Sequence, residues 1–411
     1  MSVAASTSAF RPAARLQRIK PSPSTLAAQR VRELKASGRS ILDLTVGEPD
    51  FDTPQHVKDA AVAAIAAGET KYTPVNGTPA LRQAIREHAL RTLGVEYPDA
   101  EITVGGGGKQ VIFLALMASV DEGDEVIVPA PYWVSYPDMV RANGGVPVIV
   151  ETTADAGYKI TPDALRAAIT PRTRWLILNT PGNPTGVVYT EAELAALAEV
   201  VAENPGLLVM SDEIYSEISY TSARAASLVQ VAPHLKNQVL VVNGVSKSYA
   251  MTGWRLGYAL GDPALVAAIN TLQSQTSSCP SSISQAAAAA ALSGPQDFVA
   301  ETVAEYRRRR DVAVARLAAI DGLSPLTPDG AFYVYVDCSG LIGRRTAAGA
   351  VLADDQDVTL HLLEDAGVAV IQGSAYGQSP FFRISIATDL GTIEAAADAI
   401  ADAVARLGEA D

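Results

Sequence analysis

Cysteine and histidine are scarce in this chain of 411 residues. The only residues of these two types are Cys279, Cys338, His56, His88, His234 and His361. Two cysteines cannot build a disulfide framework, and none of the six side chains stands at the spacing of a metal-binding motif. The sequence therefore predicts no metal site. Because so few cysteines fit a reducing compartment, we expect a cytoplasmic protein.

Long apolar runs and an excess of positive charge are also missing. The alanine-rich stretch 286–292 is bounded by Gln285 and Ser293 and is far shorter than the roughly 18 apolar residues that a membrane-spanning helix needs. The chain carries 32 basic and 45 acidic residues, a net charge of −13, so it has no overall field that attracts nucleic acid or an anionic membrane. We expect neither as a partner.

The N-terminal segment 1–32 lacks acidic side chains altogether. It contains the arginines Arg11, Arg15, Arg18, Arg30 and Arg32. An organellar transit peptide shows the same bias, but no amphipathic arginine-rich helix precedes Pro12. We therefore interpret residues 1–14 as a flexible tail and residues 15–52 as an N-terminal arm.

The chain does have enough apolar sequence for a large core. Apolar residues make up 48% of it and charged residues 19%, and its length favours two or three domains. Short apolar runs at 125–128, 175–179, 207–211 and 239–243 are typical of buried strands, and alanine-rich helical segments separate them. One such helix, 190–202, begins with a capping box of Thr190 and Glu193. This alternation predicts an α/β fold with a mainly parallel central sheet.

The last part of the chain predicts a smaller α+β unit. A long helix is expected over 296–320, and we interpret its arginine run 307–310 as a solvated face at the junction of two domains. Strands at 332–336 and 382–387 and helices at 358–365 and 393–407 are expected to follow.

A run of four glycines, 105–108, follows the strand-like segment 102–104 and opens an apolar helix. A helix N-terminus with free backbone N–H groups suits a phosphate. The run is not a P-loop, because Gln110 stands where a serine or threonine would bind magnesium, and it lacks the spacing of a dinucleotide-binding fingerprint. By itself the run is compatible with a phosphate site or with a plain strand-to-helix turn.

The strongest signal surrounds Lys247. Ser246 precedes this lysine, small residues frame it, and Arg255 follows eight positions later. A serine and an arginine beside a reactive amine suit a cofactor that carries a phosphate and bonds covalently to the amine. The whole segment 244–257 resembles the pyridoxal-phosphate lysine signature of class I and II aminotransferases at every defined position.

Other stretches match the same family in the same order, at 46–51, 130–133, 179–186, 211–215 and 382–385. The chain thus resembles bacterial-type aspartate aminotransferases of fold type I over nearly its whole length after the tail. The resemblance implies a large cofactor domain over 53–304, a small domain built from 15–52 and 305–411, and a homodimer with composite sites. It also implies pyridoxal 5'-phosphate as cofactor, with an amino acid and a 2-oxo acid as substrates of a ping-pong transamination.

The resemblance implies three catalytic residues, Asp212, Tyr215 and Lys247. Asp212 would face the pyridine nitrogen and keep it protonated, which makes the ring an electron sink. Tyr215, together with Asn183, would donate to the phenolic oxygen of the ring. Lys247 would hold the cofactor and then move the proton of the substrate α-carbon. The structural alternatives are a helix-capping aspartate and a tyrosine of the plain core.

The resemblance also assigns the remaining groups of the site. Trp133 would stack on the ring, and Arg383 would hold the substrate α-carboxylate in a bidentate fork. The alternatives are an ordinary buried tryptophan and a structural salt bridge. Further cofactor contacts are assigned to Gly107, Gly108, Lys109, Ser246 and Arg255. Tyr72 is assigned to the phosphate of the partner subunit's site. Further substrate contacts are assigned to Gly47, Trp133 and Asn183.

We expect dicarboxylic substrates, aspartate and glutamate. The segment 271–283, where the animal-type branch of the family has an arginine for the distal carboxylate, contains no Arg or Lys. An unpaired buried carboxylate would cost several kcal/mol, so its cation must lie elsewhere. Resemblance to the bacterial branch implies Lys109, with Lys20 or Arg15 of the N-terminal arm closing over the same end. The alternative is that Lys109 is solvated or serves the phosphate alone, and that the pocket prefers neutral or aromatic amino acids or prephenate.

Two other classes of function compete with transamination. A carbon–sulfur lyase on the same fold would eliminate a β-substituent with the same residues, and the matched motifs do not exclude it. A transcriptional regulator with an aminotransferase-like domain would need a DNA-binding module, for which the stretch before Val46 is too short.

Overall fold

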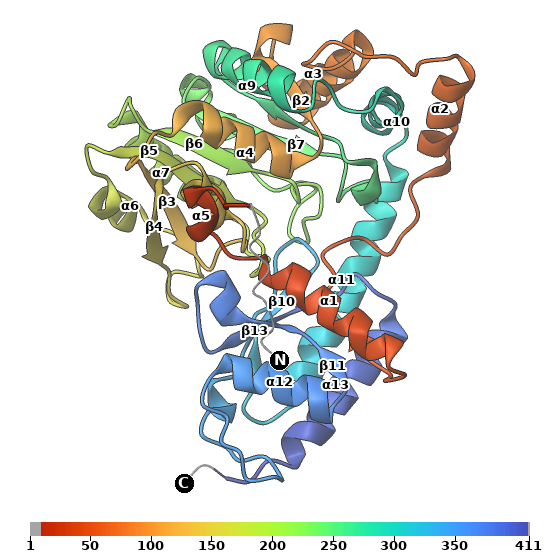
Figure 1. Cartoon of the computed structure of the whole chain (residues 1–411), viewed down its shortest axis with the longest axis vertical. Helices are drawn as coiled ribbons and strands as arrows, with labels where there is room; N and C mark the ends of the chain where they lie inside the picture. Colours follow the sequence, from red (N-terminus) through yellow and green to blue (C-terminus); the bar gives the residue numbers. More distant parts are fainter. Residues whose placement is uncertain (1–9, 410–411) are drawn as a thin grey trace, which may run out of the picture.

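The computed structural model describes residues 10–409 and shows two lobes joined by a long helix (Figure 1). The larger lobe contains a seven-stranded sheet, and the smaller lobe contains a two-stranded and a four-stranded sheet. No helix in residues 10–409 is long and apolar enough to cross a membrane.

The central sheet has the strand order β2-β8-β7-β6-β5-β3-β4. Its strands are β2 (Ile102–Gly105), β3 (Glu125–Ala130), β4 (Val146–Glu151), β5 (Thr173–Asn179), β6 (Leu208–Asp212), β7 (Val239–Gly244) and β8 (Gly257–Leu260). β8 runs antiparallel to both of its neighbours, and the other neighbouring pairs are parallel. The predicted mainly parallel sheet is confirmed. β6 begins one residue later than predicted and ends on Asp212, at the carboxyl edge of the sheet.

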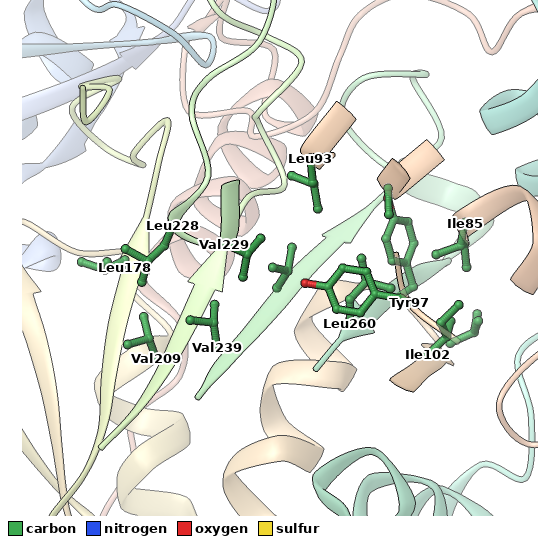
Figure 2. Packing of buried hydrophobic residues seen from close by; sticks show 14 of the residues in the cluster. Ile85, Leu93, Tyr97, Ile102, Leu178, Val209, Leu228, Val229, Val239 and Leu260 are labelled. Carbon is green, nitrogen blue, oxygen red and sulfur yellow. The ribbon is translucent and has the colours of Figure 1, made fainter. Parts of the chain in front are cut away.

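Helices cover both faces of this sheet. They are α2 (Gln55–Ala66), α3 (Pro79–Leu93), α4 (Gly108–Ser119), α5 (Tyr136–Ala142), α6 (Pro162–Ala168), α7 (Glu191–Ala202), α8 (Leu228–Val231), α9 (Pro263–Thr276) and α10 (Ser282–Ser293). Val209 and Val239 pack on the face covered by α3, α7, α8 and α10 (Figure 2). Their neighbours Met210 and Leu240 pack on the opposite face, against α4, α5 and α9. Since both faces are buried, these strands are apolar throughout instead of alternating.

The N- and C-terminal parts of the described chain meet in the smaller lobe. Its elements are α1 (Pro23–Ala36), β1 (Leu42–Asp43), β9 (Ser324–Pro325), β10 (Tyr333–Asp337), α12 (Asp355–Asp365), β11 (Val368–Ala369), β12 (Ile371–Gln372), β13 (Phe381–Ser385) and α13 (Leu390–Ala405). β1 pairs in parallel with β11, and the antiparallel sheet has the order β12-β13-β10-β9. A separate apolar core fills this lobe. The predicted small α+β unit built from both chain ends is confirmed.

Short 3-10 helices complete the chain. They are η1 (Ala14–Gln17), η2 (Asp99–Glu101), η3 (Pro233–Leu235), η4 (Thr252–Trp254), η5 (Ser339–Leu341) and η6 (Gly373–Tyr376). The capping box predicted at the start of α7 is present, because Thr190 accepts from the backbone of Glu193 and the Glu193 carboxylate accepts from the backbone of Thr190.

The connecting helix α11 (Asp297–Ala318) runs from the larger lobe into the smaller one, and the predicted domain boundary between residues 304 and 305 falls within it (Figure 1). The predicted solvated arginine face is correct for the exposed Arg308 but wrong for Arg309, which is buried. Arg309 donates to Asp50 at 2.8 Å and to Glu305 at 2.9 Å. These two carboxylates compensate its desolvation and tie α11 to the segment after β1.

Candidate active site

Polar side chains gather where the strands of the central sheet end. The carboxyl ends of β2, β5, β6 and β7 border a cavity of about 620 Å³ between the two lobes. Open α/β sheets bind ligands at this edge. The predicted site residues that line the cavity are Gly47, Gly108, Lys109, Trp133, Asn183, Asp212, Tyr215, Ser246, Lys247, Arg255 and Arg383.

Lys247 follows β7 and reaches across the cavity. Its Nζ donates a hydrogen bond to the carbonyl oxygen of Gly47 at 2.5 Å. Burial, assisted by Arg255 and opposed by Glu48, lowers the pKa of Lys247 to about 8. At neutral pH a lysine with this pKa has a much larger neutral fraction than an ordinary lysine, so it is better suited to act as a nucleophile and as a general base.

Asp212 places a buried carboxylate at the opposite wall. It accepts hydrogen bonds from the Tyr136 hydroxyl at 2.5 Å and from the backbone N–H of Ile214 at 3.3 Å. Burial raises the pKa of Asp212 to about 6, and the hydrogen bond from Tyr136 acts in the opposite direction. A carboxylate in this setting is suited to pair with a cationic ring nitrogen.

The start of α4 and Arg255 form a site for an anion. α4 begins at Gly108, so the positive end of the helix dipole lies at the cavity. Gly107 has φ +98°, and a Cβ on it would come within 2.4 Å of Nη2 of Arg255. Only glycine allows this close approach of the guanidinium to the backbone. Arg255 donates to the Thr252 carbonyl at 2.8 Å and is held at the helix start.

Arg383 lies on β13, where it is 2% exposed. Nη1 donates to Oδ1 of Asn183 at 3.0 Å, and Nη2 donates to the carbonyl oxygen of Thr45 at 2.7 Å. Its Nε is buried and has no hydrogen-bond partner within residues 10–409. Leaving a buried N–H unsatisfied is costly, so this position fits an incoming carboxylate.

Lys109 and Trp133 form a second cationic wall. Nζ of Lys109 lies 4.7 Å from the centroid of the Trp133 ring, which is a cation–π geometry. Burial, together with Arg255, lowers the pKa of Lys109. Trp133 in turn packs edge-on against Tyr136, with the ring centroids 5.2 Å apart. The lysine side chain thus lines the cavity and is exposed in the single chain.

Four predicted residues, Gly107, Tyr72, Lys20 and Arg15, are not among the residues that line this cavity, although Gly107 directly precedes the lining residue Gly108. Tyr72 is 90% exposed. Lys20 donates its backbone N–H to Asp138 at 3.4 Å, and η1, which contains Arg15, contacts α5 instead of the cavity. The expected closure of the pocket by Lys20 or Arg15 is therefore not seen in this chain. α1 covers the cavity instead, with Thr25, Ala28 and Arg32.

Tyr136 and Tyr333 are among the lining residues that were not predicted. Tyr136 stands three positions after Trp133, just beyond the stretch that matched the family, and its partner is 76 positions away. Tyr333 lies in the segment 332–336, which the sequence predicted only as a strand of the smaller unit. Both hydroxyls are aimed by tertiary packing, so no local pattern marks them.

A reactive amine, a buried carboxylate, an anion site and a buried guanidinium therefore share one cavity. This set is suited to a cofactor that is both a phosphate and a carbonyl compound, and to a substrate that carries a carboxylate. Residues 39–400 match the family described as aminotransferase class I and II. The chain belongs to this family.

Relatives with assigned names agree with this result. The chain is 50% identical over 398 residues to an aspartate aminotransferase of Rhizobium meliloti (strain 1021), covering 97% of both chains. It is 51% identical over 373 residues to an aspartate/prephenate aminotransferase of Cereibacter sphaeroides, covering 91% of this chain and 93% of the other.

Solved structures share the fold. The aspartate aminotransferase from Rhizobium meliloti superimposes with a TM-score of 0.95 at 49% identity, covering 97% of this chain and 100% of that one. The aspartate aminotransferase from Thermus thermophilus with maleate superimposes with a TM-score of 0.89 at 41% identity, covering 96% and 100%. The fold is therefore that of the fold type I aminotransferases.

Proposed function

We propose that this protein is a pyridoxal-phosphate-dependent aminotransferase that moves an amino group between aspartate or glutamate and a 2-oxo acid by a ping-pong route. The observation that carries the proposal is that Lys247, Asp212 and the buried Arg383 line one cavity. A carboxylate substrate would pair with the guanidinium, which places its α-carbon near the lysine.

The residues present fit pyridoxal phosphate. The helix start at Gly108, Ser246 and Arg255 would hold the phosphate, while Asp212 would pair with the ring nitrogen. The close approach that Gly107 allows to Arg255 supports this assignment, because a larger residue would fill the cradle. Tyr215 and Asn183 would donate to the phenolic oxygen, and Trp133 would cover the ring face.

When bound, pyridoxal phosphate supplies an electron sink that stabilises negative charge at the substrate α-carbon. Lys247 would take up the proton of the substrate α-carbon and later donate it, a task that its lowered pKa permits. Asp212 would pair with the ring nitrogen and keep it protonated. Arg383 fixes the substrate carboxylate, so the α-carbon stays within reach of the amine.

The preference for dicarboxylic substrates rests on Lys109. Its Nζ lies over Trp133 in the same cavity as Arg383, so it can pair with a second carboxylate at the far end of the substrate. The related Thermus enzyme was solved with maleate, which has two carboxylates. The name of the Cereibacter relative also includes prephenate, another dicarboxylic acid, which makes prephenate the second candidate.

A donor and acceptor panel tests this function. Aspartate plus 2-oxoglutarate should yield oxaloacetate and glutamate, with faster turnover than alanine or phenylalanine as donor. Pyruvate and ammonia from a β-substituted amino acid would instead identify a carbon–sulfur lyase. A wild-type preference for uncharged donors would reject the dicarboxylate assignment, and prephenate is added as a separate acceptor.

We also propose a homodimer in which Tyr72 of the partner subunit reaches the phosphate. Tyr72 is 90% exposed in the single chain, and Val62 and Ile65 of the neighbouring helix α2 are 64% and 53% exposed. Such a group of exposed apolar side chains favours a protein contact. Ultracentrifugation should give a dimer, and Tyr72→Phe should release the cofactor faster. A fully active monomer would remove Tyr72 from the site.

A further inference from the structure

Tyr333 connects the two lobes inside the cavity. It begins β10 of the smaller lobe and is 1% exposed. Its hydroxyl lies 2.8 Å from the hydroxyl of Tyr215, which follows β6 of the larger lobe, and the two rings meet edge to face at 5.7 Å. This contact is therefore a hydrogen bond between two buried phenols across the lobe boundary.

Arg383 packs against the ring of Tyr333. Cζ of Arg383 lies 4.2 Å from the centroid of the Tyr333 ring, in a cation–π contact. The strand register fixes this pair, because Arg383 stands opposite Tyr335, and Tyr333 is the diagonal neighbour two residues away. One side chain thus touches both the residue assigned to the substrate carboxylate and a residue assigned to the cofactor.

We propose that Tyr333 is a positioning residue for Tyr215. The Tyr333 hydroxyl donates to the Tyr215 hydroxyl, so the Tyr215 proton can point into the cavity. The Tyr333 ring supports Arg383. This inference rests on the proposed transaminase function and adds a residue to it.

The direction of the hydrogen bond follows from the role proposed for Tyr215. Neither hydroxyl has another hydrogen-bond partner in the part of the chain that is described, so either could donate in the single chain. Because Tyr215 is assigned to donate to the cofactor, Tyr333 is left as the donor of this pair. Burial raises the pKa of both phenols, but the Arg383 guanidinium opposes this rise more directly at Tyr333. The more acidic phenol is the better donor.

Space for the Tyr333 hydroxyl is provided by Gly47. A Cβ on Gly47 would lie 3.2 Å from that oxygen, tighter than an ordinary contact. Gly47 also accepts from Lys247 through its carbonyl oxygen. The segment after β1 therefore packs against the tyrosine pair and the reactive lysine together, which keeps Tyr333 in one orientation.

The experiment compares Tyr333→Phe with the matched control Tyr335→Phe in the cofactor-loaded enzyme. Both variants remove one buried phenol oxygen from β10, but the Tyr335 hydroxyl donates to the Gln378 carbonyl at 3.3 Å, away from the cavity. The readouts are kcat and KM for aspartate and the pH at which the absorbance of the bound cofactor titrates.

Tyr333→Phe is expected to lower kcat by about 3- to 10-fold, the effect of one hydrogen bond, with less than about twofold change in KM because the ring under Arg383 is kept. The cofactor absorbance should titrate at higher pH, because a weaker donation from Tyr215 stabilises the deprotonated form less. Tyr335→Phe should leave kcat, KM and the titration pH of the cofactor unchanged.

A double variant decides whether Tyr333 acts through Tyr215. In the Tyr215→Phe background, Tyr333→Phe should add nothing further to the titration shift or to the loss of kcat. Additive effects, or a wild-type titration in Tyr333→Phe with unchanged thermal stability, would overturn the proposal. If the wild-type protein neither binds pyridoxal phosphate nor transaminates, the proposed function itself has failed, which is a distinguishable result.

Discussion

The Tyr136 hydroxyl donates to Oδ2 of Asp212 at 2.5 Å, and both side chains are buried. This hydrogen bond counters the rise that burial imposes on the pKa of Asp212, which is about 6. Tyr136 therefore favours the ionised form of the Asp212 carboxyl, which is the form that would pair with a protonated ring nitrogen.

Replacing Tyr136 by Phe should raise the pKa of Asp212. The acidic limb of the kcat profile is then expected to move up by about one pH unit, since a hydrogen bond to a charged group is lost. Activity should recover in alkaline buffer. Tyr97→Phe is the control, because the Tyr97 hydroxyl is buried without a partner among the described residues. An unchanged limb in Tyr136→Phe would refute the role of Tyr136.

Asp212→Asn should stabilise the cofactor-free protein while abolishing most turnover. A carboxyl that titrates near pH 6 when folded, and near pH 4 when unfolded, lowers stability at pH 7 by about 2–3 kcal/mol. Between the unfolded and the folded pKa of Asp212, the folded state binds more protons than the unfolded state. The free energy of unfolding of the wild-type protein should therefore gain a contribution from this group as the pH falls from 7 to 4. Urea unfolding at pH 7 and pH 4 measures the effect, and the variant should lose this pH dependence.

Lys247→Ala should lose turnover but still bind the cofactor through Asp212, Arg255 and the start of α4. Borohydride reduction of the wild-type enzyme should label Lys247 alone, as peptide mapping can establish. Near wild-type turnover in the variant, or a label on another lysine, contradicts the assignment.

Lys109→Ala distinguishes a substrate role from a cofactor role. A loss of about 2–4 kcal/mol in kcat/KM for aspartate, with little change for alanine or phenylalanine, is expected if Lys109 holds the distal carboxylate. Equal losses for all three donors would place the lysine on the cofactor side. Arg32→Ala tests in parallel whether the guanidinium on α1 contributes to the same end of the cavity.

The fold and the centre of the site were predictable because their signals are local. Four apolar runs became β3, β5, β6 and β7, and the motif around Lys247 placed that lysine at the end of a strand. Asp212 and Arg383 are recognisable in sequence because a charged side chain inside an apolar strand is expensive unless a ligand or partner uses it.

The rest depends on contacts between distant segments. Tyr333 and Tyr215 are 118 positions apart, and Arg309 and Asp50 are 259 positions apart. No periodicity or spacing encodes such pairs, which is why Arg309 was expected in solvent. The path of the N-terminal arm likewise depends on distant contacts, because η1 packs on α5 and Arg18 pairs with Glu122, so the positions of Lys20 and Arg15 could not be read from the sequence.

The pairing of β1 with β11 joins two segments from opposite ends of the chain. Leu42 and Val368 are register partners, whereas the strands of the central sheet lie within residues 102–260. During synthesis the larger lobe can therefore fold before the C-terminal segment that pairs with β1 has been made, and the segment that carries Gly47 follows β1. We therefore expect the wall that accepts the hydrogen bond from Lys247 to form after the larger lobe. A newly made chain would thus have its anion site before it has a closed pocket.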